Sequence, residues 1–273
     1  MNEKFSVLLS LYFKEKPQNV RECFESLISQ TATADEWVIV EDGPLTEELY
    51  AVLDEYENKY PNLIKRVPLK ENQGLGRALN EGIKHCKNEL VARMDTDDIA
   101  VPTRFEKQLK MFKSNPKLDI CGSHIKEFTD TPDIVTSIRK VPLNDGDIKE
   151  YQKRRDAFNH MTVMYKKSMV LKAGNYQHAL LMEDTLLWVN MILSGAVCAN
   201  VDDYLVFART GKDMFMRRGG FAYFKKYKSG RKKVYDTGYI SLWDYYVTLL
   251  IQFVVAIIPN KLRKFVFEKM LRN

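Results

Sequence analysis

The residues with the clearest chemical potential are three aspartates in a span of four residues, Asp95, Asp97 and Asp98. They directly follow an apolar run at residues 90–94 that is typical of a buried β-strand. Carboxylates this close repel one another and cost stability unless a cation neutralises them. Oxygen ligands suit a hard divalent ion, Mg²⁺ or Mn²⁺, which often shares its shell with water and substrate phosphate. Acidic surface turns are also common, so the segment alone does not decide between the two interpretations.

Two acidic pairs elsewhere in the chain also occupy positions of interest. Glu41 and Asp42 follow an apolar run and precede a turn, as the three aspartates do. Glu183 and Asp184 open a segment with helical apolar periodicity. A carboxylate within reach of a hydroxyl can act as a general base. Acidic residues also favour the first turn of any helix, so the second pair has an ordinary structural explanation as well.

The elements that position these residues alternate along the first 115 residues. Apolar runs and helical periodicity predict strands at 5–12, 37–40, 63–69 and 90–94, and helices at 19–29, 49–56, 75–86 and after 103. Thr103 and Glu106 are spaced as a capping box for the last helix. This order predicts an α/β fold with a doubly wound, mostly parallel sheet covered on both faces. Ligands bind beyond the carboxyl ends of such strands, where two of the acidic turns lie.

The second half of the chain is less regular. Its patterns predict strands at 118–123, 162–165 and 196–201, and helices at 147–158 and 184–193. No linker of Pro, Gly and Ser interrupts them, so we expect one continuous domain over residues 1–210. Residues 211–273 differ in character and form a basic, apolar extension.

The composition is that of a globular protein, with 45% hydrophobic and 29% charged residues and a net charge of +6. Residues 209–233 hold ten lysines and arginines and one aspartate, whereas residues 1–208 are net negative. The basic end suggests an anionic partner, and the acidic body disfavours nucleic acid. The four cysteines lack the spacing of a metal site, and the first apolar run is too short for a signal peptide. We therefore expect reduced, buried cysteines in a cytoplasmic protein.

Residues 245–258 form an uncharged run that ends at Pro259 and is followed by basic residues. As a helix the run spans about 21 Å, which is short of the roughly 30 Å of a bilayer core. Asp244 limits its extension at the other end. The run predicts a helix lying in the interface of an anionic membrane. The alternatives are a buried core helix and an oligomer contact.

Six segments together resemble the family 2 glycosyltransferases of the GT-A fold, of the type that builds bacterial surface polysaccharides. They stand in the order of the family: FSVLLSLY (5–12), VIVEDGP (38–44), NQGLGRALNEGI (72–83), ELVARMDTDDIAVPTRFEKQ (89–108), NHMTVMYKKS (159–168) and LMEDTLLWVNMILSG (181–195). The resemblance covers roughly residues 5–200, and its ordered matches are far more specific than any one alone. It implies a nucleotide-binding half at 1–115 and an acceptor half at 116–210.

The resemblance implies a nucleotide-sugar site at the strand ends. Its residues are Ser10, Tyr12 and Asp42 for the base, Arg77 for a phosphate or the base, Asp97 for the ribose, and Asp98 with Asp97 and Asp95 for the metal. A carboxylate can accept the imide N–H of uracil, and Tyr can pack on its ring. Glu41 departs from the pattern, because an Asp is common there. Tyr12 could instead be a half-buried aromatic residue, and Arg77 a solvated helix charge.

The resemblance also implies acceptor-side roles. Asp184 becomes the catalytic base, and Glu183 assists it or binds the acceptor. His160 lies near the acceptor or the diphosphate, although a histidine at a strand edge is more often structural. The arginines of a flexible basic loop, Arg209, Arg217 and Arg218, could close over the diphosphate or meet a lipid-linked pyrophosphate, or simply form a solvated basic face.

These inferences together predict an inverting, metal-dependent transferase. It would move a hexose or N-acetylhexosamine from a nucleotide sugar, UDP-linked, to a hydroxyl of a lipid-linked glycan. The protein would sit on the inner face of the cytoplasmic membrane and serve O-antigen, capsule or exopolysaccharide synthesis. One alternative is a sugar-phosphate nucleotidyltransferase, which residues 10–20 disfavour because they contain no glycine. The other is a non-enzymatic basic membrane-binding module, which leaves the acidic turns unexplained.

Overall fold

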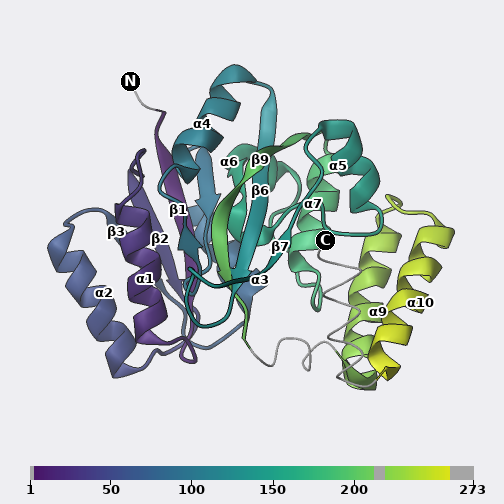
Figure 1. Ribbon diagram of the computed structural model, residues 1–273, viewed down its shortest axis with the longest axis horizontal. Coiled ribbons are helices and arrows are strands. Elements are labelled where there is room, and N and C mark those ends of the chain that lie inside the picture. The colour runs from purple at the N-terminus through teal and green to yellow at the C-terminus, as the bar shows by residue number, and fades with distance from the viewer. Residues whose placement is uncertain (1–2, 212–218, 259–273) are drawn as a thin grey trace.

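The sheet begins with a parallel half whose central strand is β1. A computed structural model describes residues 3–211 and 219–258 of the chain (Figure 1). The elements of this half are β1 (Phe5–Leu11), α1 (Pro17–Ile28), β2 (Glu36–Glu41), α2 (Glu47–Lys59), β3 (Ile64–Pro68), α3 (Leu75–His85) and β4 (Leu90–Arg93). Strand β1 pairs in parallel with β2 and with β4, and β2 pairs in parallel with β3. The alternation predicted for this half is confirmed.

The second half adds antiparallel strands to the same sheet. Its elements are β5 (Ile99–Ala100), α4 (Arg104–Ser114), β6 (Leu118–Phe128), β7 (Val135–Arg139), α5 (Asp145–Gln152), β8 (Met164–Lys166), α6 (Lys167–Lys172), α7 (Glu183–Leu193) and β9 (Val197–Arg209). The strand order is β3-β2-β1-β4-β8-β6-β9-β5, with β7 on β6. Strand β8 is antiparallel to both β4 and β6, whereas β6 and β9 are parallel. The predicted α/β class is confirmed.

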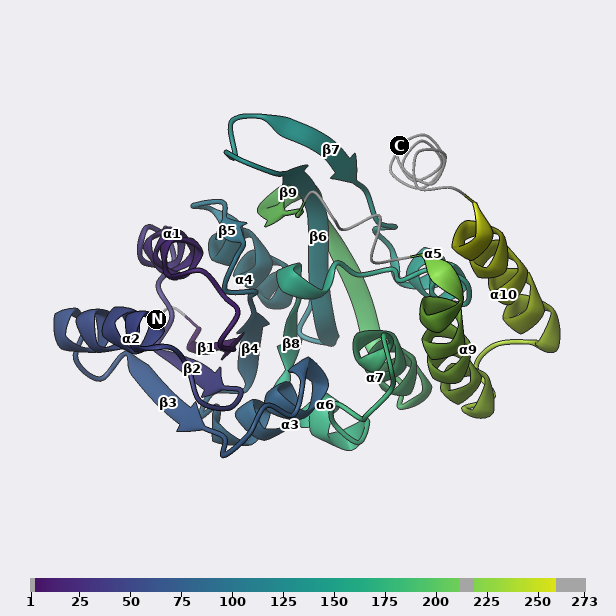
Figure 2. The same cartoon turned by 90° about the horizontal axis from the view of Figure 1, so that it is seen from below.

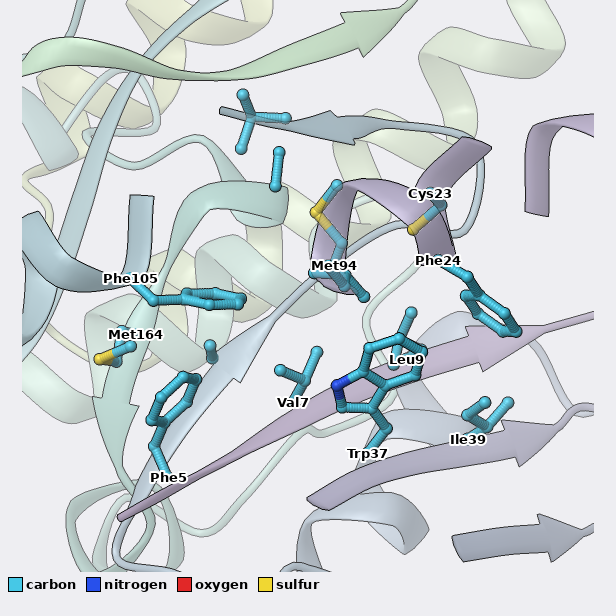
Figure 3. Close-up of a cluster of buried hydrophobic side chains, with 14 of the residues drawn as sticks. Phe5, Val7, Leu9, Cys23, Phe24, Trp37, Ile39, Met94, Phe105 and Met164 are labelled. Atoms are coloured by element: carbon cyan, nitrogen blue, oxygen red, sulfur yellow. The ribbon is translucent and has the colours of Figure 1, made fainter. Parts of the chain in front are cut away.

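Helices cover both faces of the sheet, and the alternation of side chains along β1 shows why. Val7 and Leu9 belong to one core, which α1, α2 and α4 complete, with Phe24, Trp37 and Phe105 among its large side chains (Figure 3). Leu8 belongs to the opposite core, which α3, α5, α6 and α7 complete. Figure 2 shows α1 and α4 on one side of the sheet and α3 and α6 on the other. All four cysteines are buried and unpaired.

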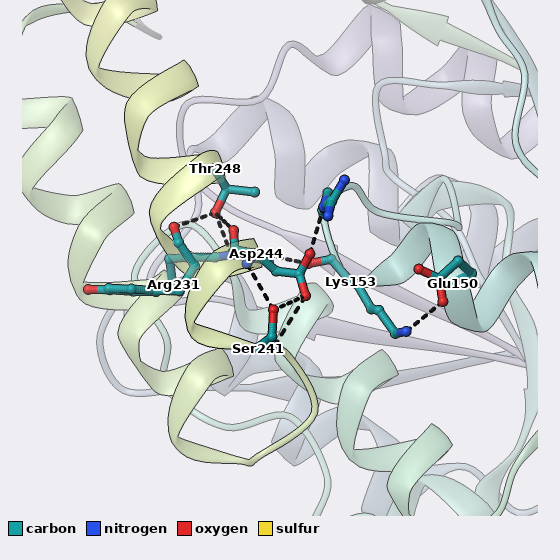
Figure 4. Close-up of polar contacts among 8 residues, drawn as sticks. Glu150, Lys153, Arg231, Ser241, Asp244 and Thr248 are labelled. Carbon is teal, nitrogen blue, oxygen red and sulfur yellow. Dashed lines mark hydrogen bonds and ion pairs between the residues drawn. The ribbon is translucent and has the colours of Figure 1, made fainter.

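Two C-terminal helices, α9 (Gly220–Asp236) and α10 (Leu242–Ile257), lie side by side, and α9 packs against α7 (Figure 1). They share with α7 a third core that includes Leu186, Val234 and Leu249. The predicted helix at 245–258 is therefore present, but it begins earlier than expected. Ser241 and Asp244 form a capping box, so Asp244 starts the helix instead of limiting it (Figure 4). Among residues 3–211 and 219–258, no helix combines the length and apolarity needed to cross a bilayer.

The predicted capping box at Thr103 and the predicted length of the helix at 147–158 were wrong, because the side chains concerned make other hydrogen bonds. Thr103 precedes α4 but makes no side-chain cap, and the carboxylate of Glu106 accepts a hydrogen bond from the Thr31 hydroxyl instead. The helix expected over 147–158 ends at Gln152. The Gln152 amide bonds to the Asp156 carboxylate and accepts the N–H of Ala157, which turns the chain away from the helix axis.

Strands β6 and β9 are longer than the apolar runs at 118–123 and 196–201 predict. The two strands pair with each other as far as Phe128 and Arg209, and this pairing holds residues that have no strand pattern of their own. The extension carries the end of β9 to the loop between β4 and β5, because β5 pairs with β9. The consequence is that Arg209 reaches the predicted metal site.

Candidate active site

The three aspartates lie in the loop between β4 and β5. One carboxylate oxygen from each aspartate lies within 4.8 Å of the corresponding oxygens of the other two, and Asp98 is buried. Burial and the neighbouring charges of Asp95 and Glu15 raise the pKa of Asp97 to about 7. Burial and the charges of Asp97 and Asp95 likewise raise the pKa of Asp98 well above its ordinary value. The loop therefore holds more negative charge than its surroundings stabilise.

One buried guanidinium compensates part of this charge. Arg93 is fully buried, and its Nη2 lies 2.5 Å from a carboxylate oxygen of Asp95. Its Nε and Nη1 have no hydrogen-bond partner among the described residues. Because Asp95 is paired with Arg93, Asp97 and Asp98 are left with the larger uncompensated charge. This all-oxygen donor set fits a hard divalent cation.

Arg209 connects this loop to the rest of the site. Its main-chain N–H donates to Asp98 at 2.7 Å, and its Nε donates to the carbonyl of Asp97 at 3.0 Å. Its Nη2 lies 2.5 Å from Glu22, and its guanidinium stacks 4.5 Å from the centroid of the Phe128 ring. The expected flexible loop is therefore wrong for Arg209, which ends β9 and is held on several sides. Arg217 and Arg218 lie outside the described residues.

The residues predicted to bind the nucleotide base lie at the ends of β1 and β2. Ser10 is half-buried, and its carbonyl accepts the Thr96 hydroxyl at 3.4 Å. Tyr12 follows β1 and is 40% exposed, with its ring edge against Phe13. Ser10 therefore lies against the aspartate loop, and Tyr12 presents an aromatic surface to solvent.

Asp42 has a structural use that the sequence did not reveal. It is buried, and its two carboxylate oxygens accept the main-chain N–H groups of Gln73 and Gly74 at 2.7 and 3.0 Å. Gly74 adopts a φ of 84°, which favours glycine, and α3 begins at the next residue. Asp42 thus fixes the start of α3. The neighbouring Glu41 pairs with Arg66 at 2.5 Å.

Arg77 is exposed on the first turn of α3. It lines a cavity of about 260 Å³ with residues that include Gln73, Tyr176 and His178. This cavity is separate from the larger one that contains Asp184. The structure therefore places Arg77 beside the start of α3, where Asp42 also acts.

The larger cavity, of about 460 Å³, lies beside the first turn of α7. Asp184 lines this cavity, whereas Glu183 packs over Gly76 of α3, where an added Cβ would lie 2.9 Å from the Cβ of Glu183. Burial, Asp156 and Glu183 raise the pKa of Asp184 to about 7. The structure thus separates the two members of the acidic pair, and it brings Asp184 into one cavity with Arg209 and His160.

His160 begins a short 3₁₀ turn (His160–Thr162) and is held by aromatic neighbours. Its Nε2 lies 3.0 Å from the Tyr176 hydroxyl, and its ring meets Trp188 edge-on at 5.7 Å. Burial and the positive charge of Arg93 hold its pKa well below the usual range. His160 is therefore neutral near pH 7 and can offer a hydrogen bond but not a charge.

Sequence reasoning missed two residues that shape this site. Arg93 stands in the strand that precedes the aspartates, and a basic residue inside an apolar run was its only signal. Asp156 follows α5 in a polar stretch with no pattern. Its carboxylate accepts the Thr185 hydroxyl at 2.6 Å, which places it beside the residue after Asp184.

A mixed sheet with a carboxylate cluster at a strand end, next to a cavity lined by a separate carboxylate, is the arrangement that the resemblance to GT-A transferases predicts. Residues 6–172 match the family model described as Glycosyl transferase family 2. The chain therefore belongs to glycosyl transferase family 2, and the protein is a glycosyltransferase.

Three curated relatives align over nearly the whole chain. An uncharacterized glycosyltransferase of Haemophilus influenzae is 44% identical over 99% of this chain and 100% of its own length. The amylovoran biosynthesis glycosyltransferase AmsE of Erwinia amylovora is 42% identical over 97% of this chain and 98% of its own. The UDP-Gal:alpha-D-GlcNAc-diphosphoundecaprenol beta-1,3-galactosyltransferase of Escherichia coli is 35% identical over 99% and 97%.

Two solved structures share the fold at low sequence identity. The mannosyltransferase PcManGT of Pyrobaculum calidifontis, in complex with GDP-Man and Mn²⁺, aligns with a TM-score of 0.66 and 13% identity over 93% of this chain and 70% of its own. S. aureus TarS 1–349, in complex with UDP-GlcNAc, aligns with a TM-score of 0.62 and 19% identity over 98% and 71%. These likenesses confirm the predicted GT-A fold.

Proposed function

We propose that the protein is an inverting, metal-dependent glycosyltransferase that moves a hexose or N-acetylhexosamine from a UDP-sugar to a hydroxyl of a lipid-linked glycan. The observation that carries the proposal is the position of Arg209. It contacts the aspartate loop and also lines the cavity that contains Asp184. A donor diphosphate at the loop and an acceptor hydroxyl at Asp184 would therefore be neighbours.

Asp97 and Asp98 are the proposed ligands of the metal, Mn²⁺ or Mg²⁺, and Asp95 supports them through its pair with Arg93. When bound, the metal neutralises the charge that develops on the diphosphate leaving group. The ion pair with Arg93 holds Asp95 in place. Arg209 fixes Asp98 through its main-chain N–H and Asp97 through its side chain.

Asp184 is the proposed general base. Its carboxylate lines the cavity, and a pKa of about 7 suits proton acceptance from a hydroxyl near neutral pH. A single base of this kind supports direct displacement and hence inversion. Glu183 lies against α3, so we assign it a supporting role in placing the first turn of α7. His160 is a neutral hydrogen-bonding group at the cavity wall.

The donor nucleotide is proposed to lie across the strand ends at Ser10, Tyr12 and Asp42, with Arg77 nearby. The exposed ring of Tyr12 gives a base a surface to stack on. The name of the E. coli relative, which includes UDP-Gal, and the UDP-GlcNAc complex of TarS support UDP as the nucleotide.

The acceptor is proposed to be a lipid-linked glycan of a surface polysaccharide, such as O-antigen, capsule or exopolysaccharide. Two relatives support this, one named for amylovoran biosynthesis and one for a diphosphoundecaprenol substrate. We further propose that the protein is peripheral on the inner face of the cytoplasmic membrane. Helix α10 exposes large apolar side chains, among them Leu242, Trp243, Tyr246, Leu250, Ile251 and Ile257. Exposed lysines on α9 would meet anionic lipid.

Titration calorimetry of the full chain with UDP, with and without Mn²⁺, tests the proposal, and GDP is the matched control. We expect UDP to bind more tightly with Mn²⁺ than without it, and more tightly than GDP. A folded sample that binds neither nucleotide would contradict the proposed donor site. A preference for GDP would overturn UDP as the donor nucleotide.

A further inference from the structure

The cavity beside Asp184 has a wall of arginines that the proposed function leaves unused. Arg139 ends β7, and Arg154 and Arg155 follow α5. All three line the cavity, on segments that lie between the family-like motifs. The same lining includes the carboxylates of Glu127, Asp156 and Asp184, and the three guanidiniums, which we call the arginine wall, are its groups suited to an anion.

Hydrogen bonds place Arg139 close to the proposed base. Its Nη2 donates to the carbonyl of Asp156 at 2.8 Å. The carboxylate of Asp156 accepts the Thr185 hydroxyl at 2.6 Å, and Thr185 follows Asp184. Two hydrogen bonds thus connect the arginine wall to the first turn of α7. One small ligand could therefore place an anionic group at this wall and another group at the Asp184 carboxylate.

Arg154 connects the same wall to the C-terminal helices. Its Nε lies 2.6 Å from the carboxylate of Asp244, which caps α10 together with Ser241. Figure 4 shows Asp244 and Ser241 in contact, with Arg231 of α9 bonded to Thr248 one turn further along α10. The exposed apolar residues of α10 begin at Leu242 and Trp243, which lie between Ser241 and Asp244 in sequence. The wall therefore lies between Asp184 and an apolar helix surface.

The cavity has room for a sugar together with an anionic group. Its volume of about 460 Å³ lies in the range of small-molecule sites. Arg154 and Arg155 are exposed, so this side of the cavity opens to solvent. Tyr223 and Tyr227 of α9 add aromatic surface to the cavity lining. A ligand that is a sugar at one end, anionic in the middle and apolar at the other end matches this order of surfaces.

We propose that Arg139, Arg154 and Arg155 bind the diphosphate of the acceptor, with its sugar toward Asp184 and its lipid toward α10. This inference rests on the proposed function and adds to it the residues that select a diphosphate-linked acceptor. Planar guanidiniums pair with phosphate oxygens in a bidentate manner, which favours two phosphates over one. The donor diphosphate is bound elsewhere, at the aspartate loop.

Binding of geranyl diphosphate to the full chain tests this inference, because this probe carries the diphosphate and a short lipid but no sugar. The protein is first saturated with UDP and Mn²⁺, so that the donor site is filled. We expect geranyl diphosphate to bind this complex and geranyl monophosphate to bind it more weakly. Arg155→Gln should weaken geranyl diphosphate binding about tenfold. Arg154→Gln should do the same, provided that its melting temperature shows α10 intact.

Arg21→Gln is the matched control, since Arg21 is a partly exposed arginine that pairs with Glu55 on the surface. It should leave geranyl diphosphate binding unchanged. Equal binding by the wild type and by folded Arg155→Gln and Arg154→Gln would overturn the inference. No binding to the wild type would do the same, as would weaker probe binding with UDP present than without it. UDP affinity, measured in the same samples, reports separately on the proposed function. If the arginine variants bind geranyl diphosphate as the wild type does and UDP affinity is normal, the arginine site is rejected and the proposed function is unaffected.

Discussion

The main-chain N–H of Arg209 donates a hydrogen bond of 2.7 Å to the carboxylate of Asp98. Arg209 is the last residue of β9, and Asp98 is the last residue before β5, so the bond joins the two halves of the sheet at the aspartate loop. The same arginine lines the cavity of Asp184. A bound donor and a bound acceptor would thus both lie beside Arg209 at the end of β9.

Asp98→Asn tests the metal site. The substitution removes a negative charge from a buried cluster in which burial and repulsion already raise the pKa of Asp98. We expect Mn²⁺-dependent UDP affinity to fall by at least about tenfold, because a ligand to the metal is lost. Without Mn²⁺ the variant should be no less stable than the wild type, since repulsion is relieved.

Calorimetry of UDP binding and thermal unfolding would measure both effects. Asp54→Asn is a suitable control, because Asp54 is exposed and pairs with Arg66 away from the loop. If Asp98→Asn kept the full Mn²⁺ effect on UDP binding, Asp98 would not be a metal ligand.

Asp184→Asn separates chemistry from binding. The amide keeps the size of the side chain and loses the ability to accept a proton. We expect transfer to fall by about 10²–10⁴-fold while UDP affinity stays nearly unchanged. Glu183→Gln should retain far more activity, because its side chain packs over Gly76 and lies outside the cavity lining.

Turnover with a UDP-sugar, measured beside UDP binding, would check this prediction. The two substitutions are chemically matched and one residue apart, so a general disturbance of α7 would affect both. Full turnover by Asp184→Asn would reject the assignment of the base.

The strand ends were predictable because their signals are local. An apolar run followed by acidic residues identifies both the end of β4 and the aspartates behind it, and the same holds for β2 and Asp42. The partners of these residues were not predictable in the same way. Arg93 pairs with Asp95 in the loop that follows the end of β4, and the apolar run does not specify the conformation of that loop. Arg209 reaches Asp98 only because β9 is extended by pairing with β6, a contact between segments that are far apart in sequence.

The acceptor cavity illustrates the same limit. Asp156, Asp184 and Arg139 come from three separate segments, and each has an ordinary local explanation as a polar residue at a helix or strand end. Their common location depends on where α5 and α7 pack. The different positions of Glu183 and Asp184 also depend on packing. Glu183 packs against α3, whereas Asp184 lines the cavity.

The activity should depend on pH through Asp184. Burial together with the charges of Asp156 and Glu183 raises its pKa to about 7. A base must be deprotonated to act, so kcat/KM should fall as the pH drops below about 7. Asp156→Asn removes one of the repelling charges, which makes ionisation of Asp184 easier and lowers its pKa. We therefore expect the acid limb of the profile to move to lower pH in this variant.

The profiles of kcat/KM against pH for the wild type, Asp156→Asn and Asp147→Asn would decide the matter. Asp147 is exposed on α5 and serves as the nearby control. An acid limb that did not move in a folded Asp156→Asn variant, or that moved to higher pH, would show that Asp184 does not control the profile.

Helix α10 should carry the contact with membranes. Trp243 is 70% exposed and Leu250 is 64% exposed, whereas Tyr245 and Leu249 of the same helix are buried against α7 and α9. Burying such side chains in the lipid interface contributes about 1.5–3 kcal/mol each. Leu250→Asp should therefore reduce binding to vesicles that contain phosphatidylglycerol by at least about tenfold, without loss of UDP binding.

The control for Leu250→Asp is Leu193→Asp, because Leu193 is similarly exposed but ends α7. Co-sedimentation with phosphatidylglycerol vesicles and with neutral phosphatidylcholine vesicles would measure both the apolar and the electrostatic contributions. If Leu250→Asp bound the anionic vesicles as well as the wild type, the exposed side of α10 would not be the membrane surface.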